Sequence, residues 1–349
     1  MAEREGLTAT PTPDRGKPWR SLTDRFGRTI TYVRLSVTDR CDLRCRYCMA
    51  ERMEFLPRQD LLTLEELAEL ADALIARGVR RIRLTGGEPL VRRGIVGLVE
   101  AIGQHIGNGL DELTMTTNAT QLATVARDLH RYGIRRLNIS LDSLDHERFR
   151  AITRRGDLDQ VLAGIAAAQD AGLAVKINMV ALKALNEDEI GTMVGWCGER
   201  GFDLSLIETM PLGAVEEDRT NHYLPLDLVK RRLAREYVLI PSLHRTGGPA
   251  RYYDVAETSR RIGFITPLTD NFCAGCNRIR ISATGTIFGC LGRDQRIELR
   301  DAMRVGGRDA IDAALDAVMT AKPLRHEFDI ARSQPAVVNG GAKVGHSAA

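Results

Sequence analysis

The chain has 349 residues, of which 44% are hydrophobic and 27% charged, and its formal net charge is +3. This composition is typical of a soluble globular protein, and the length suits one large domain with a smaller addition. The net charge is too small, and aromatic residues at 5% are too scarce, to predict a nucleic-acid partner. No apolar run approaches the ~20 residues that a membrane helix needs, so we expect no membrane partner.

The N-terminal segment is polar, contains three prolines and lacks an apolar core. It therefore resembles neither a signal peptide nor a transit peptide, and we expect a disordered leader over residues 1–21. Without an export signal the expected location is cytoplasmic, where thiols stay reduced and free to bind metal.

Six β-type runs then alternate with helical segments. The helices carry recognisable ends: Thr63 and Glu66 form a capping box, Gly78, Gly133 and Gly172 close helices, and Asn186 with Glu189 is expected to open another. Such alternation predicts a parallel sheet. The runs are Tyr32–Val37, Arg80–Thr85, Glu112–Thr117, Arg135–Leu141, Ala174–Leu182 and Asp203–Thr209.

Five of these strands alternate polar and apolar side chains with a period of two. A closed eight-stranded barrel packs branched apolar residues inside, whereas here the apolar face must go to the helices. An antiparallel sheet with one wet face would alternate in the same way, but the intervening helices argue against it. We predict an α/β fold, an incomplete six-stranded (β/α)6 TIM-like barrel with a polar, anion-binding lumen. The polar side chains include Arg34, Ser36, Arg83, Thr85, Thr114, Thr116, Asn138, Ser140, Lys176 and Asn178.

The pattern changes after residue 210. A helix is expected over Pro225–Tyr237, short strands over Gly263–Pro267, Arg278–Ala283 and Thr286–Gly289, a helix over Asp309–Thr320, and no clean period over Pro241–Arg261. We therefore divide the chain into a core at 22–210, an α+β cap at 211–330 that covers the open side of the barrel, and a tail at 331–349.

Three thiols follow the first strand with the spacing C-x3-C-x2-C, at Cys41, Cys45 and Cys48. Three ligands this close can hold one face of a metal or metal–sulfur cluster and leave a coordination position open for chemistry. Zinc fingers and ribbons instead use two separated pairs of ligands, so a structural zinc site fits this motif poorly.

Two further features accompany this motif. Thr85-Gly-Gly-Glu-Pro89 ends the second strand; its glycines allow close backbone approach and exposed N–H groups, and Glu88 could hold an ammonium group. Cys273, Cys276 and Cys290 form a second trio, suited either to zinc with a remote fourth ligand or to a second cluster with one open iron. The remaining thiol, Cys197, follows helical spacing and is expected in the core.

Together these motifs resemble the radical S-adenosylmethionine enzymes and, within them, the GTP 3′,8-cyclases that open molybdenum cofactor biosynthesis. The resemblance runs from about Leu22 to Arg332. The matching stretches are Arg34–Cys41, Cys41–Cys48, Thr85–Arg93, Thr116–Asn118, Asn138–Asp142 and Phe272–Arg280.

The resemblance implies two [4Fe–4S] clusters, held by Cys41, Cys45 and Cys48 and by Cys273, Cys276 and Cys290. It implies S-adenosylmethionine contacts at Tyr47, Gly87, Ser140 and Met210. It also implies GTP contacts at Arg34, Arg83, Thr116, Lys176, Arg278, Ile279 and Arg280. The implied reaction starts from a 5′-deoxyadenosyl radical that removes H-3′ of GTP, after which the ribose attacks C8 and yields (8S)-3′,8-cyclo-7,8-dihydroguanosine 5′-triphosphate. No catalytic side chain is expected, because the cofactors carry the radical chemistry.

The implied partners are GTP, an electron donor of the flavodoxin or ferredoxin type (dithionite in vitro) and a downstream cyclic pyranopterin monophosphate synthase, with a homodimer left open. The family usually ends in two glycines on a tail that enters the active site; here Gly340-Gly341 is followed by eight more residues, and the expected preceding basic residue is weakly matched by Arg332. Two alternatives stay open: a radical S-adenosylmethionine peptide maturase with an auxiliary cluster, against which the cationic lumen counts, and a non-catalytic zinc-stabilised binding module.

Overall fold

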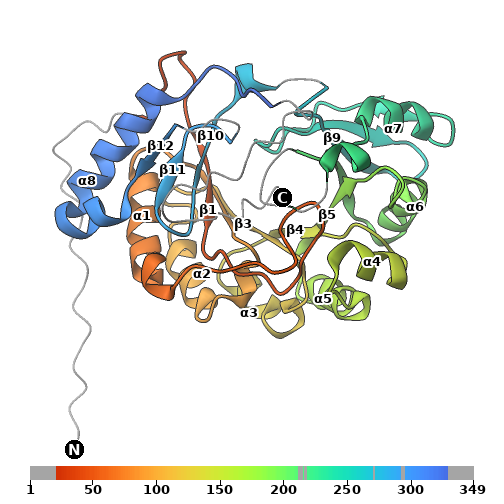
Figure 1. The fold of residues 1–349 in the computed structure, drawn as a ribbon, viewed down its shortest axis with the longest axis horizontal. Coiled ribbons are helices and arrows are strands. Elements are labelled where there is room, and N and C mark those ends of the chain that lie inside the picture. Colours follow the sequence, from red (N-terminus) through yellow and green to blue (C-terminus); the bar gives the residue numbers. More distant parts are fainter. Residues whose placement is uncertain (1–20, 211–214, 216–217, 270–271, 292–294, 329–349) are drawn as a thin grey trace, which may run out of the picture.

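A curved sheet surrounded by helices forms the body of the molecule (Figure 1). The structure is a computed structural model that describes residues 21–210, 215, 218–269, 272–291 and 295–328. The predicted leader, apart from Ser21, and the predicted tail with its glycine pair lie outside the described residues.

Six parallel strands stand side by side in chain order. Each agrees with its predicted run to within one residue at either end, so the parallel sheet is confirmed and the antiparallel alternative is wrong for this part of the chain. The strands are β1 (Tyr32–Ser36), β2 (Arg81–Thr85), β3 (Glu112–Thr117), β4 (Arg136–Ser140), β5 (Ala174–Ala181) and β6 (Asp203–Glu208).

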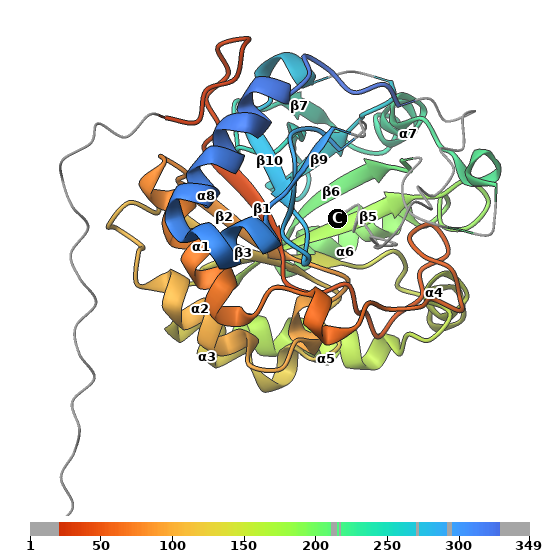
Figure 2. The same ribbon diagram turned by 60° about the vertical axis from the view of Figure 1, so that its left-hand side comes forward.

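Six helices connect these strands and cover the outer face of the sheet (Figure 2). The capping box at Thr63 and Glu66 is present, and Gly78, Gly133 and Gly172 take positive φ after their helices, as predicted. Asn186 does not open a helix, since α6 begins at Ile190 without a side-chain cap. The helices are α1 (Leu64–Ala76), α2 (Ile95–Gly103), α3 (Ala126–Arg131), α4 (His146–Thr153), α5 (Leu158–Asp170) and α6 (Ile190–Arg200).

The later strands extend this same sheet at both edges. β10 (Arg278–Ile281) pairs in parallel with β1, and β9 (Arg260–Ile265) pairs in parallel with β6. Antiparallel strands follow outward on each side: β11 (Thr286–Phe288) and β12 (Arg296–Glu298), and β8 (Arg251–Val255) and β7 (Leu239–Pro241). Within the described residues the sheet stays open, with β12 and β7 at its ends.

The two C-terminal helices differ in length from their predictions. α7 (Leu226–Leu233) is shorter than expected, whereas α8 (Arg300–Ala321) begins nine residues before the predicted start at 309. The sequence prediction missed the first part of α8 because that part contains Gly306 and Gly307. Gly307 is indeed non-helical, with φ 52° and ψ −134°. The short strands β7, β8 and β12 were not predicted, because three to five residues at a sheet edge carry little periodic signal.

Both faces of the central sheet are buried. The apolar side chains of the strands pack against the helices in one continuous core that includes Cys197, as predicted. The polar side chains face inward, and Arg34, Arg83 and Lys176 are only 7%, 6% and 6% exposed. The predicted polar lumen is therefore confirmed. No helix in the described part of the chain is long and apolar enough to span a lipid bilayer.

Candidate active site

The first cysteine trio lies on the loop that follows β1, at the C-terminal end of the strands. Its backbone is tied down: Arg44 Nη1 donates to the carbonyl oxygens of Cys41 and Leu43, and the Arg44 and Arg46 amides donate to α4. All three cysteines lie outside disulfides and are partly buried. The loop thus holds three sulfur ligands on a fixed backbone.

The Gly-Gly-Glu-Pro loop after β2 packs backbone to backbone on this cysteine loop. The Gly87 amide donates to Thr38 O (2.9 Å) and the Glu88 amide donates to Arg40 O (2.8 Å). A Cβ at Gly87 would lie 2.3 Å from Arg40 O, closer than real contacts allow. The prediction that this loop exposes N–H groups is therefore wrong for Gly87 and Glu88, because their amides donate to the cysteine loop.

Glu88 joins the same loop to the end of β3. Its carboxylate accepts from Leu90 N (2.9 Å), Thr117 Oγ1 (2.8 Å) and Asn118 N (2.6 Å), and the residue is 1% exposed. Burial raises the pKa of Glu88 to about 7. The expectation that Glu88 holds an ammonium group stays a prediction, and its two oxygens accept three hydrogen bonds from the protein in this structure.

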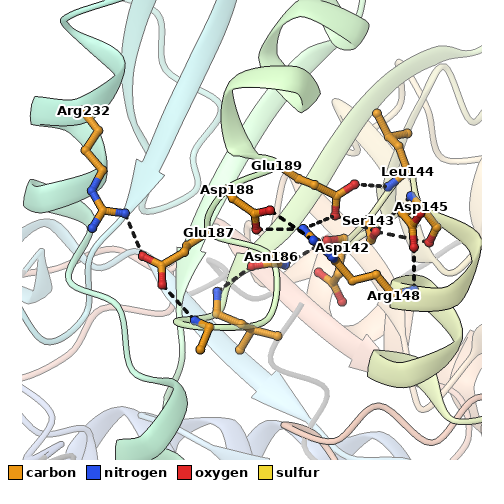
Figure 3. Close-up of polar contacts among 12 residues, drawn as sticks. Asp142, Ser143, Leu144, Asp145, Arg148, Asn186, Glu187, Asp188, Glu189 and Arg232 are labelled. Carbon is orange, nitrogen blue, oxygen red and sulfur yellow. Dashed lines mark hydrogen bonds and ion pairs between the residues drawn. The ribbon is translucent and has the colours of Figure 1, made fainter.

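Tyr47 is fixed by a buried carboxylate on the far side of the loop. Its hydroxyl donates to Asp142 Oδ2 (2.7 Å), while Asp142 Oδ1 accepts from Val180 N (2.8 Å). Burial raises the pKa of Asp142 to about 6. Asn186, fully buried, donates to the carbonyl oxygen of Asp142 (Figure 3). It also donates to that of Val180 and so links the ends of β4 and β5.

One cavity lies over the first trio. Among the residues predicted from the resemblance, Tyr47, Gly87 and Ser140 line it with the three cysteines, and so does Thr116. Oγ1 of Thr116 is buried without a hydrogen-bond partner among the described residues. Met210 lies elsewhere, because it lines the neighbouring cavity.

The second cavity lies between the second trio and the lumen cations. Cys273, Cys276 and Cys290 line it together with Arg34, Arg83, Lys176, Arg278, Ile279 and Arg280. Asn178 and Ile207 line both cavities, so the two spaces meet. The structure thus brings the predicted residues together around two adjoining cavities, with a cysteine trio at each.

Three arginines stand side by side across adjacent strands of the lumen. Arg34 on β1 is in register with Arg83 on β2 and with Arg280 on β10. Burial and the neighbouring guanidinium groups lower the pKa of Arg280 well below its usual value, and burial lowers that of Arg83 to about 10. Like charges directly opposite one another destabilise a sheet unless an anion lies between them. Nε of Arg83 is buried and has no hydrogen-bond partner in the part of the chain described.

Lys176 adds a fourth buried cation from β5. Its ammonium donates to Tyr252 Oη (2.6 Å) on β8. Burial, followed by the charges of Arg83 and Arg136, lowers the pKa of Lys176 to about 7. A polyanion in this lumen would relieve all of these unfavourable charges at once.

The two trios differ in their electrostatic surroundings. Burial and the carboxylates of Glu88 and Asp142 raise the pKa values of Cys41 and Cys45, respectively. Burial would also raise the pKa of Cys276, but the charges of Arg278 and Lys322 bring it below the usual value. Cys41 and Cys45 therefore lie mainly beside carboxylates, with Arg44 also nearby, whereas Cys276 lies beside two cations.

The donor sets suit clusters rather than single ions. No three His, Cys, Asp or Glu side chains of the described residues converge on one metal-binding point. A [4Fe–4S] cluster places each thiolate on a different iron and does not require such convergence. At each trio, three cysteines line one cavity together with polar groups, an arrangement that can supply one thiolate to each of three irons.

Some features of the site escaped the sequence analysis. Glu88 and Asp142 lay inside motifs that were recognised, but their hydrogen-bond partners depend on loops distant in the chain. His326, whose Nε2 is buried without a partner among the described residues, and Tyr252 line or contact the second cavity. Lone residues in segments without periodicity give no sequence signal.

An open parallel α/β sheet with three cysteines after its first strand defines the class: this is a radical S-adenosylmethionine enzyme. Residues 35–197 match the model of the radical SAM superfamily, and residues 202–328 match that of Molybdenum Cofactor Synthesis C. The chain belongs to the GTP 3′,8-cyclase family. Relatives of that name share 56% identity in Erythrobacter litoralis (90% of this chain, 95% of the relative) and 57% in Rhodopseudomonas palustris (90% and 92%).

Solved structures share the fold at low identity. Streptococcus suis SuiB bound to its precursor peptide SuiA superposes with a TM-score of 0.57 at 18% identity, over 84% of this chain and 65% of that one. Native anSMEcpe with bound AdoMet superposes with a TM-score of 0.56 at 13% identity, over 83% of each chain. These likenesses support the partial TIM-like barrel, and at such identities they carry the fold alone.

Proposed function

We propose that this protein cyclises GTP to (8S)-3′,8-cyclo-7,8-dihydroguanosine 5′-triphosphate in molybdenum cofactor biosynthesis. The observation that carries the proposal is the pair of adjoining cavities, each with a cysteine trio and with four buried cations at the second. A nucleoside triphosphate is the kind of ligand that would use this arrangement, because its phosphates neutralise the cations while its base reaches the second trio. Family membership at 52–57% identity supports the same reaction.

The family's cofactors are S-adenosylmethionine and [4Fe–4S] clusters. We assign one cluster to Cys41, Cys45 and Cys48 and an auxiliary one to Cys273, Cys276 and Cys290. When bound, the first cluster with S-adenosylmethionine supplies the 5′-deoxyadenosyl radical that removes H-3′ of GTP. Tyr47, Gly87 and Ser140 line the cavity where S-adenosylmethionine would lie, and Met210 would approach from the neighbouring cavity.

The chain's own contribution is to bind, orient and shield the reactants. Guanidinium groups offer forked donors to phosphate oxygens, so Arg34, Arg83 and Arg280 would grip the triphosphate, with Lys176 as a point charge. Arg278 and Ile279 would face the same ligand, and Thr116 would contact it from the first cavity. Holding the ribose beside the radical source and excluding water are what positioning contributes to such a reaction.

The proposal extends to the division of the chain into domains, its location and its partners. The barrel core at 22–210 would carry the first cluster and the cap at 211–330 the second, with a leader at 1–21 and a tail at 331–349. We propose a cytoplasmic location, a flavodoxin- or ferredoxin-type electron donor and a downstream cyclic pyranopterin monophosphate synthase.

Two alternatives make different demands. A peptide maturase would need a groove for a peptide and no cluster of buried cations, and the likeness to SuiB concerns the fold alone. A zinc-stabilised module would bind zinc without iron or sulfide.

Metal content combined with GTP binding tests the proposal. Anaerobically purified protein should contain about eight iron and eight sulfide per chain. Cys290→Ser should lose about half of the iron and much of the GTP affinity, while Cys197→Ser, in the core of α6, should keep both. Zinc in place of iron, or unaltered GTP affinity in Cys290→Ser, would contradict it.

A further inference from the structure

Lys322 is a buried lysine immediately after α8. It is 2% exposed, whereas lysine is rarely fully buried without partners. It lies 32 residues beyond Cys290 in the chain and belongs to none of the recognised motifs. Its burial therefore calls for a physical reason.

The ammonium group of Lys322 points at the second cysteine trio. It donates to Cys276 Sγ (3.7 Å), to Arg278 O (2.9 Å) and to Gly289 O. These three contacts use all three of its donors. Lys322 thereby binds the backbone beside two of the cysteines. Arg278 is two positions after Cys276, and Gly289 directly precedes Cys290.

The backbone around Lys322 is held close to the same trio. A Cβ at Gly289 would lie 3.2 Å from Lys322 Cα, tighter than most real contacts, so a side chain there would require Lys322 to shift. Arg28, oriented by Asp24 (2.6 Å), donates to the carbonyl oxygens of Cys273 (2.9 Å), Pro323 and Leu324. A backbone hydrogen bond from His326 also reaches Cys273. Residues 322–326 thus wrap the trio on the side of α8.

The nearest charges at the first trio are different. Carboxylates of Asp42 and Glu88 act on Cys41 and that of Asp142 acts on Cys45, and the Arg44 guanidinium also interacts with both thiols. Hydrogen bonds to cluster sulfurs and nearby charge are the protein's means of setting the reduction potential of an iron–sulfur cluster.

We propose that Lys322 is a positioning residue of the second trio, which fixes Cys276 and favours the reduced form of the cluster bound there. The inference rests on the proposed function, which supplies that cluster. Reduction adds one electron from an external donor, and a fixed positive charge at the cysteine sulfur stabilises the added negative charge. Lys322 therefore makes the second cluster easier to reduce than its cysteines alone would.

An anaerobic redox titration of the reconstituted holoenzyme, followed by electron paramagnetic resonance with dithionite as reductant, tests this. Lys322→Gln keeps a hydrogen-bond donor and removes the charge. We expect its second cluster to be at least tenfold harder to reduce, which is about 59 mV for one electron. The first cluster should be unchanged. Lys322→Arg should stay near wild type, and Lys230→Gln, which removes a lysine bonded to Tyr253, should alter neither cluster.

The outcomes are distinguishable. Full iron content with an unshifted second cluster in Lys322→Gln would overturn the inference, as would equal shifts of both clusters. Loss of the second cluster in Lys322→Gln with retention in Lys322→Arg would support it, whereas loss in both variants would overturn the role of charge. A wild-type protein with about four iron would instead contradict the proposed function.

Discussion

Lys176 is a single residue whose burial makes ligand binding depend on pH. Its pKa is lowered to about 7, so above pH 7 the free protein holds it mostly neutral. Phosphate oxygens favour the ammonium form and raise this pKa, so that GTP binding takes up a proton in this range. We expect GTP affinity to fall as pH rises above about 7, by up to tenfold per pH unit.

Equilibrium binding of GTP to the anaerobic holoenzyme between pH 6 and 8.5 measures this. Lys176→Arg, which stays charged throughout, should retain only the pH dependence that belongs to GTP itself. Identical pH profiles for both proteins would contradict the role of Lys176.

Arg83 shows the cost of keeping a binding site charged before its ligand arrives. The pKa of Arg83, lowered from its usual value to about 10, corresponds to roughly 3 kcal/mol against the charged form. Arg83→Met relieves part of the repulsion from Arg34 and should raise the melting temperature of the GTP-free protein. The expected rise is about 1–2 °C for each kcal/mol of relief in a chain of this length.

The same variant should lose most of the stabilisation that GTP confers on the wild type. Thermal melting with and without GTP measures both effects, with Arg127→Met, exposed on α3, as the control. A lower melting temperature without GTP, or an undiminished shift with it, would speak against an anion-binding role.

Among the elements, the loops after β1 and β2 function as one unit. Gly87 allows their backbones to touch, since a Cβ there would lie 2.3 Å from Arg40 O. Gly87→Ala should separate the loops, weaken S-adenosylmethionine binding at least tenfold and reduce the iron held by the first trio. Gly97→Ala on α2, where a Cβ meets nothing within 4 Å, is the matched control.

Binding of S-adenosylmethionine and iron content measure the effect. Wild-type values for both in Gly87→Ala would show that the loop contact does not position the cofactor site.

The elements also show what sequence can and cannot predict. Strands β1–β6 were located to within one residue, because the two-residue alternation is sustained in β1–β5 and the neighbouring helices carry glycines or capping residues at their ends. The first half of α8 was missed because of its two glycines, and β12 because three residues show no period. Asn186 was misassigned because its side chain binds Asp142 and Val180 rather than a helix end.

On the scale of the whole molecule, segments far apart in the chain meet at one site. β1 and β10 pair directly, which brings Arg34 opposite Arg280 across 246 positions of sequence. The cysteine trios and the lumen cations could be listed from the sequence, through spacing and family resemblance. The partners of Glu88 and the burial of Lys322 could not, because both depend on contacts between segments far apart in the chain.

The tail allows a test of the complete chain. Deleting residues 340–349 removes the glycine pair and its extension and should abolish GTP cyclisation, because the resemblance implies a tail that enters the active site. Reductive cleavage of S-adenosylmethionine should persist, since no residue of either cavity is removed. Chromatography of 5′-deoxyadenosine and of the cyclised product measures the two reactions. Unchanged cyclisation in the truncated protein would refute the role of the tail.

The central claim is that GTP lies between the two cysteine trios and is the substrate. Anaerobic incubation of the reconstituted protein with GTP, S-adenosylmethionine and dithionite tests it most directly. We predict that 5′-deoxyadenosine forms in step with the loss of GTP. With GTP deuterated at C3′, the deuterium should appear in 5′-deoxyadenosine. GTP that remains intact while 5′-deoxyadenosine accumulates would contradict the claim.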